Sequence, residues 1–393
     1  MKLMLVSSSS GSHGGGEPYF VHLARGLIQR GHSVDLWIAD HPRMDGIADQ
    51  LPAECQLRRI KYTNTYDRKT RVIGAVLDRG TRRRLADNFR KTRPDLIHIN
   101  KQNLEDGLDL LLAASDTQIP SVATIHITRT MAELNATAGV VRDWWTRRVL
   151  EVSRCRLLAI STQCQRDLTR FLRGGPEILL ALNGVPDVEL ADRERVRARF
   201  GFDKQDIVIG TLARLEAQKN PLFLLSVLQS LPEHCKLLWV GDGSLRGQFE
   251  AEIRTRGLSD RVRATGWIPQ ASELLAAFDI FALPSLFEGL PFSLLEACAA
   301  GLPIITNPVE GIDDVIESEE NGIIVPSSTE EAWRGALSRL IVDPQFRARL
   351  GATARESYLS RFSVESMVRD TERAYETVTR DWPCCSRSAV ADV

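Results

Sequence analysis

The sequence alternates short apolar runs with helical stretches along most of its 393 residues. Six apolar runs in the first half predict strands, at residues 2–7, 34–39, 95–99, 122–126, 157–161 and 178–182. Helical stretches separate them, at residues 17–30, 76–92, 104–115, 139–154 and 163–172. This alternation predicts an α/β fold, in which parallel sheets carry helices on both faces. Ligands of such sheets bind at the carboxyl ends of the strands, so functional residues are expected in the turns there.

The chain is longer than one hydrophobic core usually organises, so the sequence predicts two domains. Asn183 and Gly184 form a turn signal, and Pro186 breaks regular structure directly after it. These residues place the predicted boundary after residue 186, with a second α/β domain at 187–365. The polar tail, 383–393, has no pattern and is expected to be frayed.

Composition indicates a globular protein without a membrane span. Apolar residues make up 43% of the chain and charged residues 26%, which is typical of soluble domains. The apolar run at residues 3–6 is too short for the core of a signal peptide. The seven cysteines form no CxxC pair and no zinc-like cluster with histidine, which indicates reduced thiols. We therefore expect a cytoplasmic protein that holds no metal.

Positive charge gathers in one segment of the first half. Residues 1–190 carry 27 Lys and Arg against 21 Asp and Glu, whereas residues 191–393 carry 23 against 30. The basic segment, residues 58–93, has 13 basic residues against three acidic ones. Each basic residue near anionic lipid contributes on the order of 1 kcal/mol of attraction. The segment lacks the interleaved aromatic residues and the motifs of nucleic-acid binders. It therefore predicts contact with an anionic membrane surface, on the inner face, and no nucleic-acid partner.

Trp144 and Trp145 are flanked by Arg142, Arg147 and Arg148. The pair could lie at lipid headgroups, line a groove for an acceptor, or pack as part of an ordinary helix. The sequence leaves these three interpretations open.

Residues 284–301 hold the pattern from which a function follows most directly. A predicted strand at 279–283 precedes them, a loop follows, and Pro291 fits the first turn of a helix. Gly301 ends that helix. The loop therefore places a carboxylate, that of Glu288, beside a helix N-terminus.

The N-terminus of this predicted helix offers a seat for a phosphate. Its first amides, from Phe292, Ser293 and Leu294, lack partners within the helix, and the helix dipole is positive there. Glu296 lies about one turn further along an otherwise apolar helix, where an unpaired charge is costly. A ligand that carries a diol near its phosphate would partner both Glu288 and Glu296.

Two cations stand five residues apart in the loop after the predicted strand at 206–213. Arg214 offers planar, bidentate donors, and Lys219 offers a compact point charge. Together they suit a diphosphate.

The two glutamates have seven residues between them, and this run resembles the EX7E motif of retaining glycosyltransferases of family 4. Members of that family have the GT-B fold, in which two Rossmann-like domains with parallel sheets face each other across a cleft. The resemblance implies that Glu296 holds the ribose of a nucleotide-sugar and that Glu288 lies against the donor sugar. It also implies that backbone amides of Phe292, Ser293 and Leu294 hold the diphosphate.

The resemblance extends over nearly the whole chain. Residues 213–220 resemble the family's Gly-Arg-Leu-x-x-x-Lys-Gly, with Ala213 and Asn220 in place of the two glycines. The match implies that Arg214 and Lys219 hold the diphosphate of the donor.

Other matches imply further site residues. Residues 27–34 resemble the family's Leu-x-x-Arg-Gly-His-x-Val, which follows a glycine loop near the donor phosphate and the acceptor. Gly15 and Gly16 are the corresponding residues here. A histidine at the strand end of His126 contacts the donor sugar in the family, and the backbone of Ile268 is implied to contact the base.

The remaining expectations concern the linker, the last helix, His98 and Gly311. The turn at Asn183 resembles the interdomain linker of the family, and residues 366–382 are implied to cross back onto the first domain. His98, also at a strand end, is expected to be structural and satisfied by a backbone carbonyl. The family's Gly-x-x-Glu is replaced by Gly311 and the shorter acid Asp314, which leaves that contact open.

The resemblance implies a hexosyltransferase that moves a sugar, from a UDP-sugar rather than a GDP-sugar, to an acceptor hydroxyl with retention of anomeric configuration. The resemblance implies a reaction without metal or cofactor, with a lipid-linked or saccharide acceptor, in bacterial polysaccharide or glycolipid biosynthesis. The residues implied to act in it are Glu288, His126, Arg214 and Lys219. Two alternatives stay open. One is an inverting GT-B transferase or an epimerase with His13 or His126 as base, and the other is a catalytically silent nucleotide-sugar-binding scaffold.

Overall fold

The computed structural model describes residues 1–9, 11 and 15–382. The chain forms two compact units, of which unit 1 comprises Met1–Leu182 and Met367–Val393 and unit 2 comprises Asn183–Ser366. The division after Leu182 lies close to the boundary predicted at residue 186. His13 and the tail at 383–393 lie outside the described residues.

Unit 1 is built on a parallel sheet of seven strands. Their order in the sheet is β3 (Gln56–Ile60), β2 (Ser33–Ala39), β1 (Lys2–Ser7), β4 (Leu96–Asn103), β5 (Ser121–Ile127), β6 (Arg156–Ala159) and β7 (Leu179–Leu180). The central strands are buried on both faces, as their nearly continuous apolar runs require. The polar edge strand β3 was not predicted, because its sequence, Gln-Leu-Arg-Arg-Ile, lacks that apolar signal. Charged residues on an exposed edge also oppose pairing with another chain.

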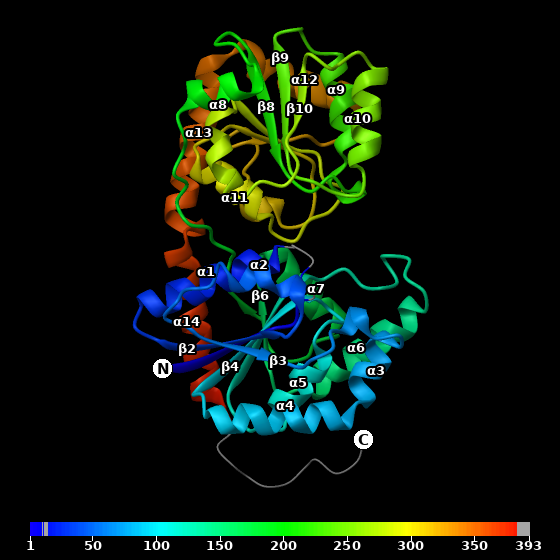
Figure 1. Cartoon of the computed structure of the whole chain (residues 1–393), viewed down its shortest axis with the longest axis vertical. Helices are drawn as coiled ribbons and strands as arrows, with labels where there is room; N and C mark the ends of the chain where they lie inside the picture. The colour runs from blue at the N-terminus through cyan, green and yellow to red at the C-terminus, as the bar shows by residue number, and fades with distance from the viewer. Residues whose placement is uncertain (10, 12–14, 383–393) are drawn as a thin grey trace. The chain divides into compact units, whose positions relative to one another are not determined.

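Helices cover both faces of this sheet. On one face, α1 (Gly16–Gln29) and α14 (Val364–Asp381) both reach β4, since Tyr19 and Tyr375 contact the ring of His98. On the other face, four helices pack against one another (Figure 1). They are α3 (Arg71–Leu77), α4 (Arg79–Thr92), α5 (Leu108–Ser115) and α6 (Gly139–Val152). The short α2 (Asp45–Ala48) follows β2, and α7 (Thr162–Phe171) packs on β5, β6 and β7.

Unit 2 repeats the architecture with six parallel strands. Their order is β10 (Val262–Ala264), β9 (Cys235–Val240), β8 (Ile207–Leu212), β11 (Ile280–Leu283), β12 (Ile304–Thr306) and β13 (Ile323–Ile324). Within this unit α9 (Pro221–Gln229), α10 (Arg246–Thr255) and α12 (Glu330–Val342) share one side, as Figure 1 shows. The opposite side carries α8 (Arg193–Phe200), α11 (Phe292–Ala299) and α13 (Pro344–Ser357). A core that includes Trp239, Phe249 and Trp333 fills the first of these interfaces.

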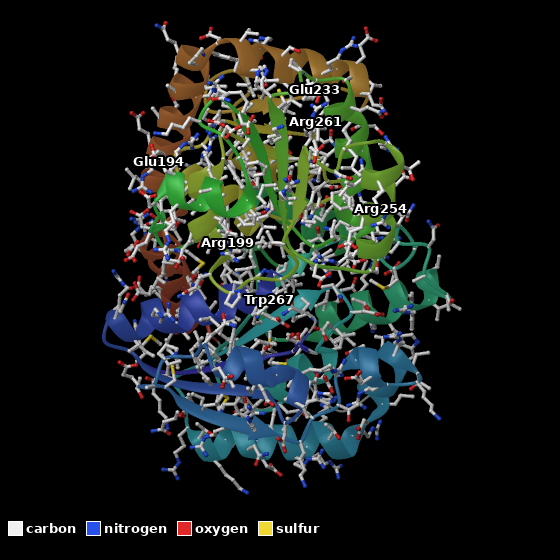
Figure 2. All side chains as sticks on the ribbon, turned by 45° about the horizontal axis from the view of Figure 1, so that its top comes forward. Glu194, Arg199, Glu233, Arg254, Arg261 and Trp267 are labelled. Atoms are coloured by element: carbon white, nitrogen blue, oxygen red, sulfur yellow. The ribbon has the colours of Figure 1, made fainter. Side chains whose placement is uncertain are left out.

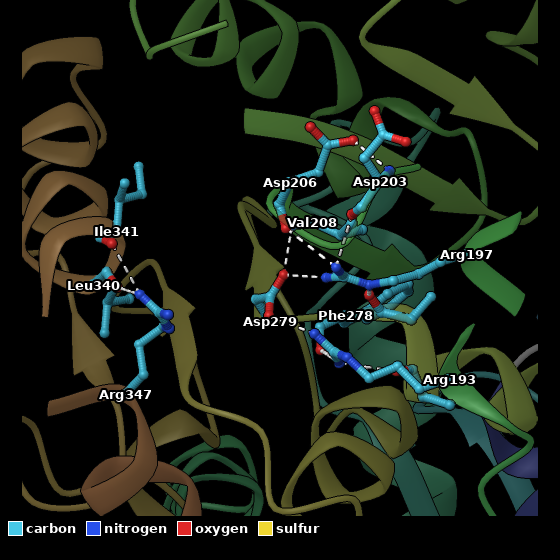
Figure 3. Close-up of polar contacts among 12 residues, drawn as sticks. Arg193, Arg197, Asp203, Asp206, Val208, Phe278, Asp279, Leu340, Ile341 and Arg347 are labelled. Atoms are coloured by element: carbon cyan, nitrogen blue, oxygen red, sulfur yellow. Dashed lines mark hydrogen bonds and ion pairs between the residues drawn. The ribbon is translucent and has the colours of Figure 1, made fainter. Parts of the chain in front are cut away.

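A buried polar cluster fastens α8 to the sheet of unit 2 (Figure 3). Asp279 accepts hydrogen bonds from Arg193, at 2.5 Å, and from Arg197. The same carboxylate accepts the backbone N–H of Val208 at 2.7 Å, so it joins the helix to the start of β8. Because Asp279 directly precedes β11, this cluster fixes the two central strands at their amino ends.

In each sheet the strand order reverses at one place. The reversal lies between β1 and β4 in unit 1 and between β8 and β11 in unit 2. Ligands of open α/β sheets bind outside the carboxyl ends of the strands at such a point. A site is therefore expected at the loops after β8 and β11 in unit 2, and at those after β1 and β4 in unit 1.

Candidate active site

The predicted cations and the predicted carboxylate follow the two strands at the reversal point of unit 2. Arg214 and Lys219 lie in the loop after β8, and Glu288 lies in the loop after β11. The two strands are paired in the sheet, with Ile209 opposite Ile280. Both loops therefore leave the same edge of the sheet side by side.

Three consecutive residues of the β11 loop are bound to the β8 loop. Lys219 Nζ lies 2.5 Å from Glu288 Oε1, and both side chains are largely buried. Gln218 Nε2 donates to the Phe287 carbonyl at 2.9 Å, and the Leu286 N–H donates to the Gln218 carbonyl at 2.8 Å. The structure thus brings Lys219 and Glu288 into direct contact.

A second amide side chain holds the start of the same loop. Asn307, which follows β12 and is 1% exposed, donates through Nδ2 to the carbonyls of Pro284 and Ser285, at 2.9 and 3.1 Å. Trp333 Nε1 donates to Asn307 Oδ1 at 2.9 Å and fixes the orientation of the amide. Neither Asn307 nor Gln218 could be singled out from the sequence, because their role depends on backbone groups that are distant in sequence.

Arg214 differs from Lys219 in its surroundings. Its side chain is exposed and forms no hydrogen bond or ion pair with the residues that the structure describes. Hydrogen bonds from Ser244, and to a smaller extent the charge of Arg214, lower the pKa of Glu216. Its backbone is fixed, since the Leu215 N–H donates to the Asp242 carbonyl at 2.9 Å. Gly241 allows this approach, because a Cβ there would lie 2.1 Å from the Ala213 carbonyl oxygen. A held backbone and an available guanidinium suit the capture of an anion.

Helix α11 begins at Phe292, one residue later than predicted, with Pro291 as its N-cap. The expectation that Leu294 offers an unpaired amide was wrong, because its N–H donates to the Pro291 carbonyl at 3.1 Å. The side chains of Phe292 and Ser293 are partly buried at this terminus. The positive end of the dipole remains, and it lies directly after the Glu288 loop.

Glu296 lies one turn into α11 and is partly buried. Burial raises the pKa of its carboxyl to about 7. Within the described part of the chain, this carboxylate has no hydrogen-bond or ion-pair partner. A buried acid without a partner costs stability, which suggests a ligand as the missing partner.

The predicted base-contacting residue, Ile268, lies in the turn after β10 and is partly buried. The neighbouring Trp267, labelled in Figure 2, is 64% exposed. The Gly241 N–H donates to the Gly266 carbonyl at 3.0 Å, so this turn is bound to the end of β9. Ile268 therefore lies in a further loop at the carboxyl edge of the unit 2 sheet, in addition to the loops after β8 and β11.

The predicted residues of unit 1 gather at its own reversal point. Gly16 begins α1, Gly15 precedes it, and a Cβ on Gly16 would lie 2.4 Å from Gln102 Oε1. Asn100, on β4, donates to the Gly16 carbonyl at 2.7 Å, and its Oδ1 lies 2.7 Å from His126 Nε2. Asn100 thus links His126 to the glycine turn, a connection that the sequence did not reveal.

The two strand-end histidines of unit 1 are buried. Burial lowers the pKa of His126 to about 3, so its ring is neutral at physiological pH. His98 bonds to the hydroxyls of Tyr375 and Thr124, each at 2.7 Å. Its role is structural in this geometry, but its partners are side chains and not the backbone carbonyl that was expected.

Comparison with known proteins identifies the family. Residues 13–187 match the family model described as Glycosyltransferase Family 4, and residues 192–357 match that of Glycosyl transferases group 1. The chain belongs to family 4 of the glycosyltransferases.

Relatives of this family 4 member include proteins of known name. The chain is 34% identical over 198 residues to EpsF of Bacillus subtilis, a protein named as a glycosyltransferase, and the match covers 46% of this chain and 50% of EpsF. It is 26% identical over 274 residues to the UDP-Gal:alpha-D-GlcNAc-diphosphoundecaprenol alpha-1,3-galactosyltransferase of Escherichia coli, covering 65% of this chain and 68% of that enzyme. The chain thus spans only half to two thirds of these relatives.

The fold agrees with that of solved family structures. The structure of Anabaena Alr3699/HepE in complex with UDP and glucose matches with a TM-score of 0.77 at 19% identity, over 96% of this chain and all of that one. The family 4 member thus has two Rossmann-like units of the GT-B class, as predicted. None of its described helices is both long enough and apolar enough to cross a membrane.

Proposed function

We propose that this chain is a retaining glycosyltransferase that moves a sugar from a UDP-sugar to a hydroxyl of a lipid-linked acceptor in bacterial polysaccharide or glycolipid biosynthesis. The observation that carries the proposal is the arrangement of the loops after β8 and β11. There the Lys219–Glu288 pair precedes a helix N-terminus, and Glu296, one turn further along, has no hydrogen-bond or ion-pair partner among the described residues. A diphosphate that links a ribose to a sugar matches this combination of groups.

Each part of the donor has a partner of suitable chemistry. Arg214 and the N-terminus of α11, at Phe292 and Ser293, attract the diphosphate. Glu296 accepts hydrogen bonds from the ribose hydroxyls, and the backbone at Ile268 contacts the base. Uridine is favoured because the HepE structure holds UDP and the galactosyltransferase relative is named for UDP-Gal.

In the proposed reaction the bond between the anomeric carbon and the diphosphate oxygen breaks, and a bond to the acceptor oxygen forms on the same face. The proton of the acceptor hydroxyl passes to the departing diphosphate oxygen. Negative charge grows on the departing diphosphate. Arg214, Lys219 and the helix dipole offset that charge electrostatically, so the proposal includes no metal ion or cofactor. Glu288, which is held by its ion pair with Lys219, orients the sugar.

The contribution of unit 1 to substrate binding stays a prediction. Gly15, Gly16 and His126 are proposed to form contacts with substrate, and the neutral ring of His126 suits hydrogen bonding. A pKa of about 3 makes His126 a weak base at neutral pH, which disfavours the inverting or epimerase alternative that needs it.

The lipid-linked acceptor and the membrane surface are the finer parts of the proposal. The name of the galactosyltransferase relative contains a diphosphoundecaprenol acceptor. The basic segment supports attraction to anionic lipid, because six of its exposed cations have no hydrogen-bond or ion-pair partner among the described residues. They are Arg58, Lys61, Lys69, Arg83, Lys91 and Arg93. Four other arginines of the segment pair with acids, namely Arg59, Arg68, Arg82 and Arg90.

Donor hydrolysis by the purified protein tests the proposal. Wild type is expected to release UDP from one member of a UDP-sugar panel, and Glu288→Ala is expected to reduce the rate about a hundredfold or more, as loss of one electrostatic contact in a transition state does elsewhere. Equal rates in the two proteins would favour the catalytically silent scaffold. NMR of the product then gives the anomeric configuration, and an inverted product would exclude the retaining mechanism.

A further inference from the structure

Helix α6 of unit 1 exposes an apolar face. Val140 is 75% exposed, Val141 is 50% exposed and Trp144 is 56% exposed. Residues three and four apart on a helix are neighbours, so these three side chains form one surface, here called the α6 face. Exposed Leu134 lies in the loop just before the helix. Soluble proteins seldom gather large apolar side chains in this way without a partner.

The α6 face is held rigidly outward. Asp143, on the buried side of the helix, accepts the backbone N–H groups of Met131 and Ala132 at 2.8 and 2.9 Å. Arg142 pairs with the buried Glu105, and Val149 and Leu150 pack into the unit. The helix therefore has its core side already occupied, and rotation to bury the α6 face would break these contacts.

Trp144 has a side chain suited to a boundary between lipid and water. It packs edge-to-face on Trp145, with ring centroids 5.2 Å apart, and its own ring still lies largely in solvent. Tryptophan combines a large apolar surface with one N–H donor, and for this reason it gathers at the headgroup level of membranes.

Charge around the α6 face distinguishes among partners. Helix α3, which lies within the basic segment, packs directly on α6 (Figure 1). The exposed Lys69 precedes α3, the exposed Arg83 lies on the adjacent α4, and Leu77, at the end of α3, is 62% exposed. Because α3 and α6 are in contact, the apolar face and the basic segment belong to the same part of unit 1. This combination fits an anionic bilayer, whereas a second copy of this chain would bring the same cations together.

We propose that the α6 face inserts among the headgroups of an anionic lipid bilayer while the basic segment holds the surrounding lipids. The inference rests on the proposed function only in that a lipid-linked acceptor gives such docking a purpose. Attraction by the basic segment alone would be lost at high salt, because surface charges are screened. Insertion of Val140, Val141 and Trp144 adds a hydrophobic contribution to membrane binding that salt does not remove.

Binding to vesicles tests the inference. Full-length protein is mixed with vesicles of phosphatidylcholine containing about one third phosphatidylglycerol, first at low salt and then at 0.5 M NaCl, where the Debye length is on the order of 5 Å. Wild type is expected to float with the vesicles at low salt and to keep part of its binding at high salt. The fluorescence of Trp144 is expected to shift to the blue as its ring leaves water.

Four variants separate the contributions. Trp144→Phe is expected to bind nearly as well but to lose the blue shift, and Val140→Asp is expected to weaken binding at least tenfold at both salt concentrations. Lys69→Glu is expected to weaken binding mainly at low salt. Trp267→Ala, which removes an equally exposed tryptophan from unit 2, is expected to change neither binding nor the shift. Because Val140 is 75% exposed, the melting temperature of its variant is expected to equal that of wild type.

Several outcomes would overturn the inference. Binding that is unchanged in Val140→Asp, or a blue shift that survives in Trp144→Phe, would show that the α6 face does not enter the bilayer. Equal binding to pure phosphatidylcholine would remove the role of charge, and a concentration-dependent dimer that Val140→Asp abolishes would assign the face to a second copy of the chain. Donor hydrolysis without vesicles serves as the separate measure of the proposed function, because the three variants of unit 1 are expected to keep it.

Discussion

The ammonium of Lys219 and the carboxylate of Glu288 lie 2.5 Å apart in unit 2, and their side chains are only 13% and 6% exposed. In this structure the charge of Lys219 is thus balanced by Glu288. Arg214, five residues earlier, is exposed and has no side-chain hydrogen bond or ion pair in the described part of the chain. The two cations thus differ in their surroundings, since Lys219 is paired with a carboxylate and Arg214 is exposed. We therefore expect different effects when each is replaced.

The Lys219–Glu288 pair predicts coupled effects on stability. Removal of either partner leaves a largely buried charge, so Lys219→Met and Glu288→Gln are each expected to destabilise the protein by about 2–4 kcal/mol. The double variant is expected to lose about 1–3 kcal/mol less than the sum, because neither charge is left alone. Chemical unfolding of wild type and the three variants measures the cycle, and strictly additive losses would mean that the pair contributes little.

Replacement of the exposed Arg214 is expected to weaken ligand binding without an effect on stability. Arg214→Ala is expected to weaken UDP binding by roughly tenfold or more, since a charge-assisted hydrogen bond contributes about 1.5–3 kcal/mol, and to leave the melting temperature unchanged. Arg254, on α10 and labelled in Figure 2, is also exposed and provides the matched control. Calorimetric titration with UDP compares the two variants. A similar small loss in both would reduce the effect of Arg214 to general surface charge.

Gln218 predicts a kinetic effect without direct contact with the donor. Gln218→Ala removes the hydrogen bond to the Phe287 carbonyl, which costs about 1 kcal/mol of stability and loosens the loop that carries Glu288. We expect kcat for donor hydrolysis to fall by on the order of tenfold with little change in KM, because a misplaced group loses effect mainly in the transition state.

A matched control for this variant exists in unit 1. Gln165 Nε2 donates to the Ile178 carbonyl at 2.7 Å, so Gln165→Ala removes the same kind of hydrogen bond elsewhere. Gln165→Ala is expected to lose similar stability and to keep kcat. If the two variants lose kcat equally, the effect belongs to stability in general and Gln218 has no positioning role.

The sequence predicted the two parallel sheets because the signals involved are local. Continuous apolar runs mark the buried strands β1, β4 and β5, and helical stretches separate them. The motif residues follow strand ends, which parallel strands bring to one edge. Lys219 and Glu288 were therefore expected close together, and the structure pairs them. Glu296 has no side-chain partner in the described part of the chain, and an external partner for this acid stays a prediction.

Other features depend on contacts between distant residues and could not be predicted. Asn307 holds the Glu288 loop through two carbonyl oxygens, and Asn100 joins Gly16 to His126. No local pattern distinguishes such an amide from one on the surface. The amide of Leu294 was predicted to be unpaired because the tight bond to the Pro291 carbonyl depends on the exact start of the helix.

Glu296 predicts a pH dependence of stability. Burial raises the pKa of the folded carboxyl to about 7 from an ordinary value of 4.5, so between these values the folded protein holds a proton that the unfolded chain releases. Stability is therefore expected to fall as pH rises from about 4.5 to about 7, and the loss is complete above that range. Glu296→Gln cannot ionise, so its melting temperature is expected to exceed that of wild type at pH 8 and to equal it near pH 4.

The same residue predicts that donor binding changes in the opposite direction. Ribose hydroxyls donate best to an ionised carboxylate, so wild-type affinity for UDP is expected to rise as pH increases through about 7. UDP itself titrates near this range. Comparison of wild type with Glu296→Gln cancels that contribution, because titration of the ligand affects both proteins equally. The ratio of the UDP affinity of wild type to that of Glu296→Gln, measured by titration calorimetry from pH 6 to pH 8.5, is therefore expected to increase with pH. A ratio that stays constant while Glu296→Gln is more stable at pH 8 would make Glu296 a buried acid without a role in binding, because its ionisation would then matter to folding alone.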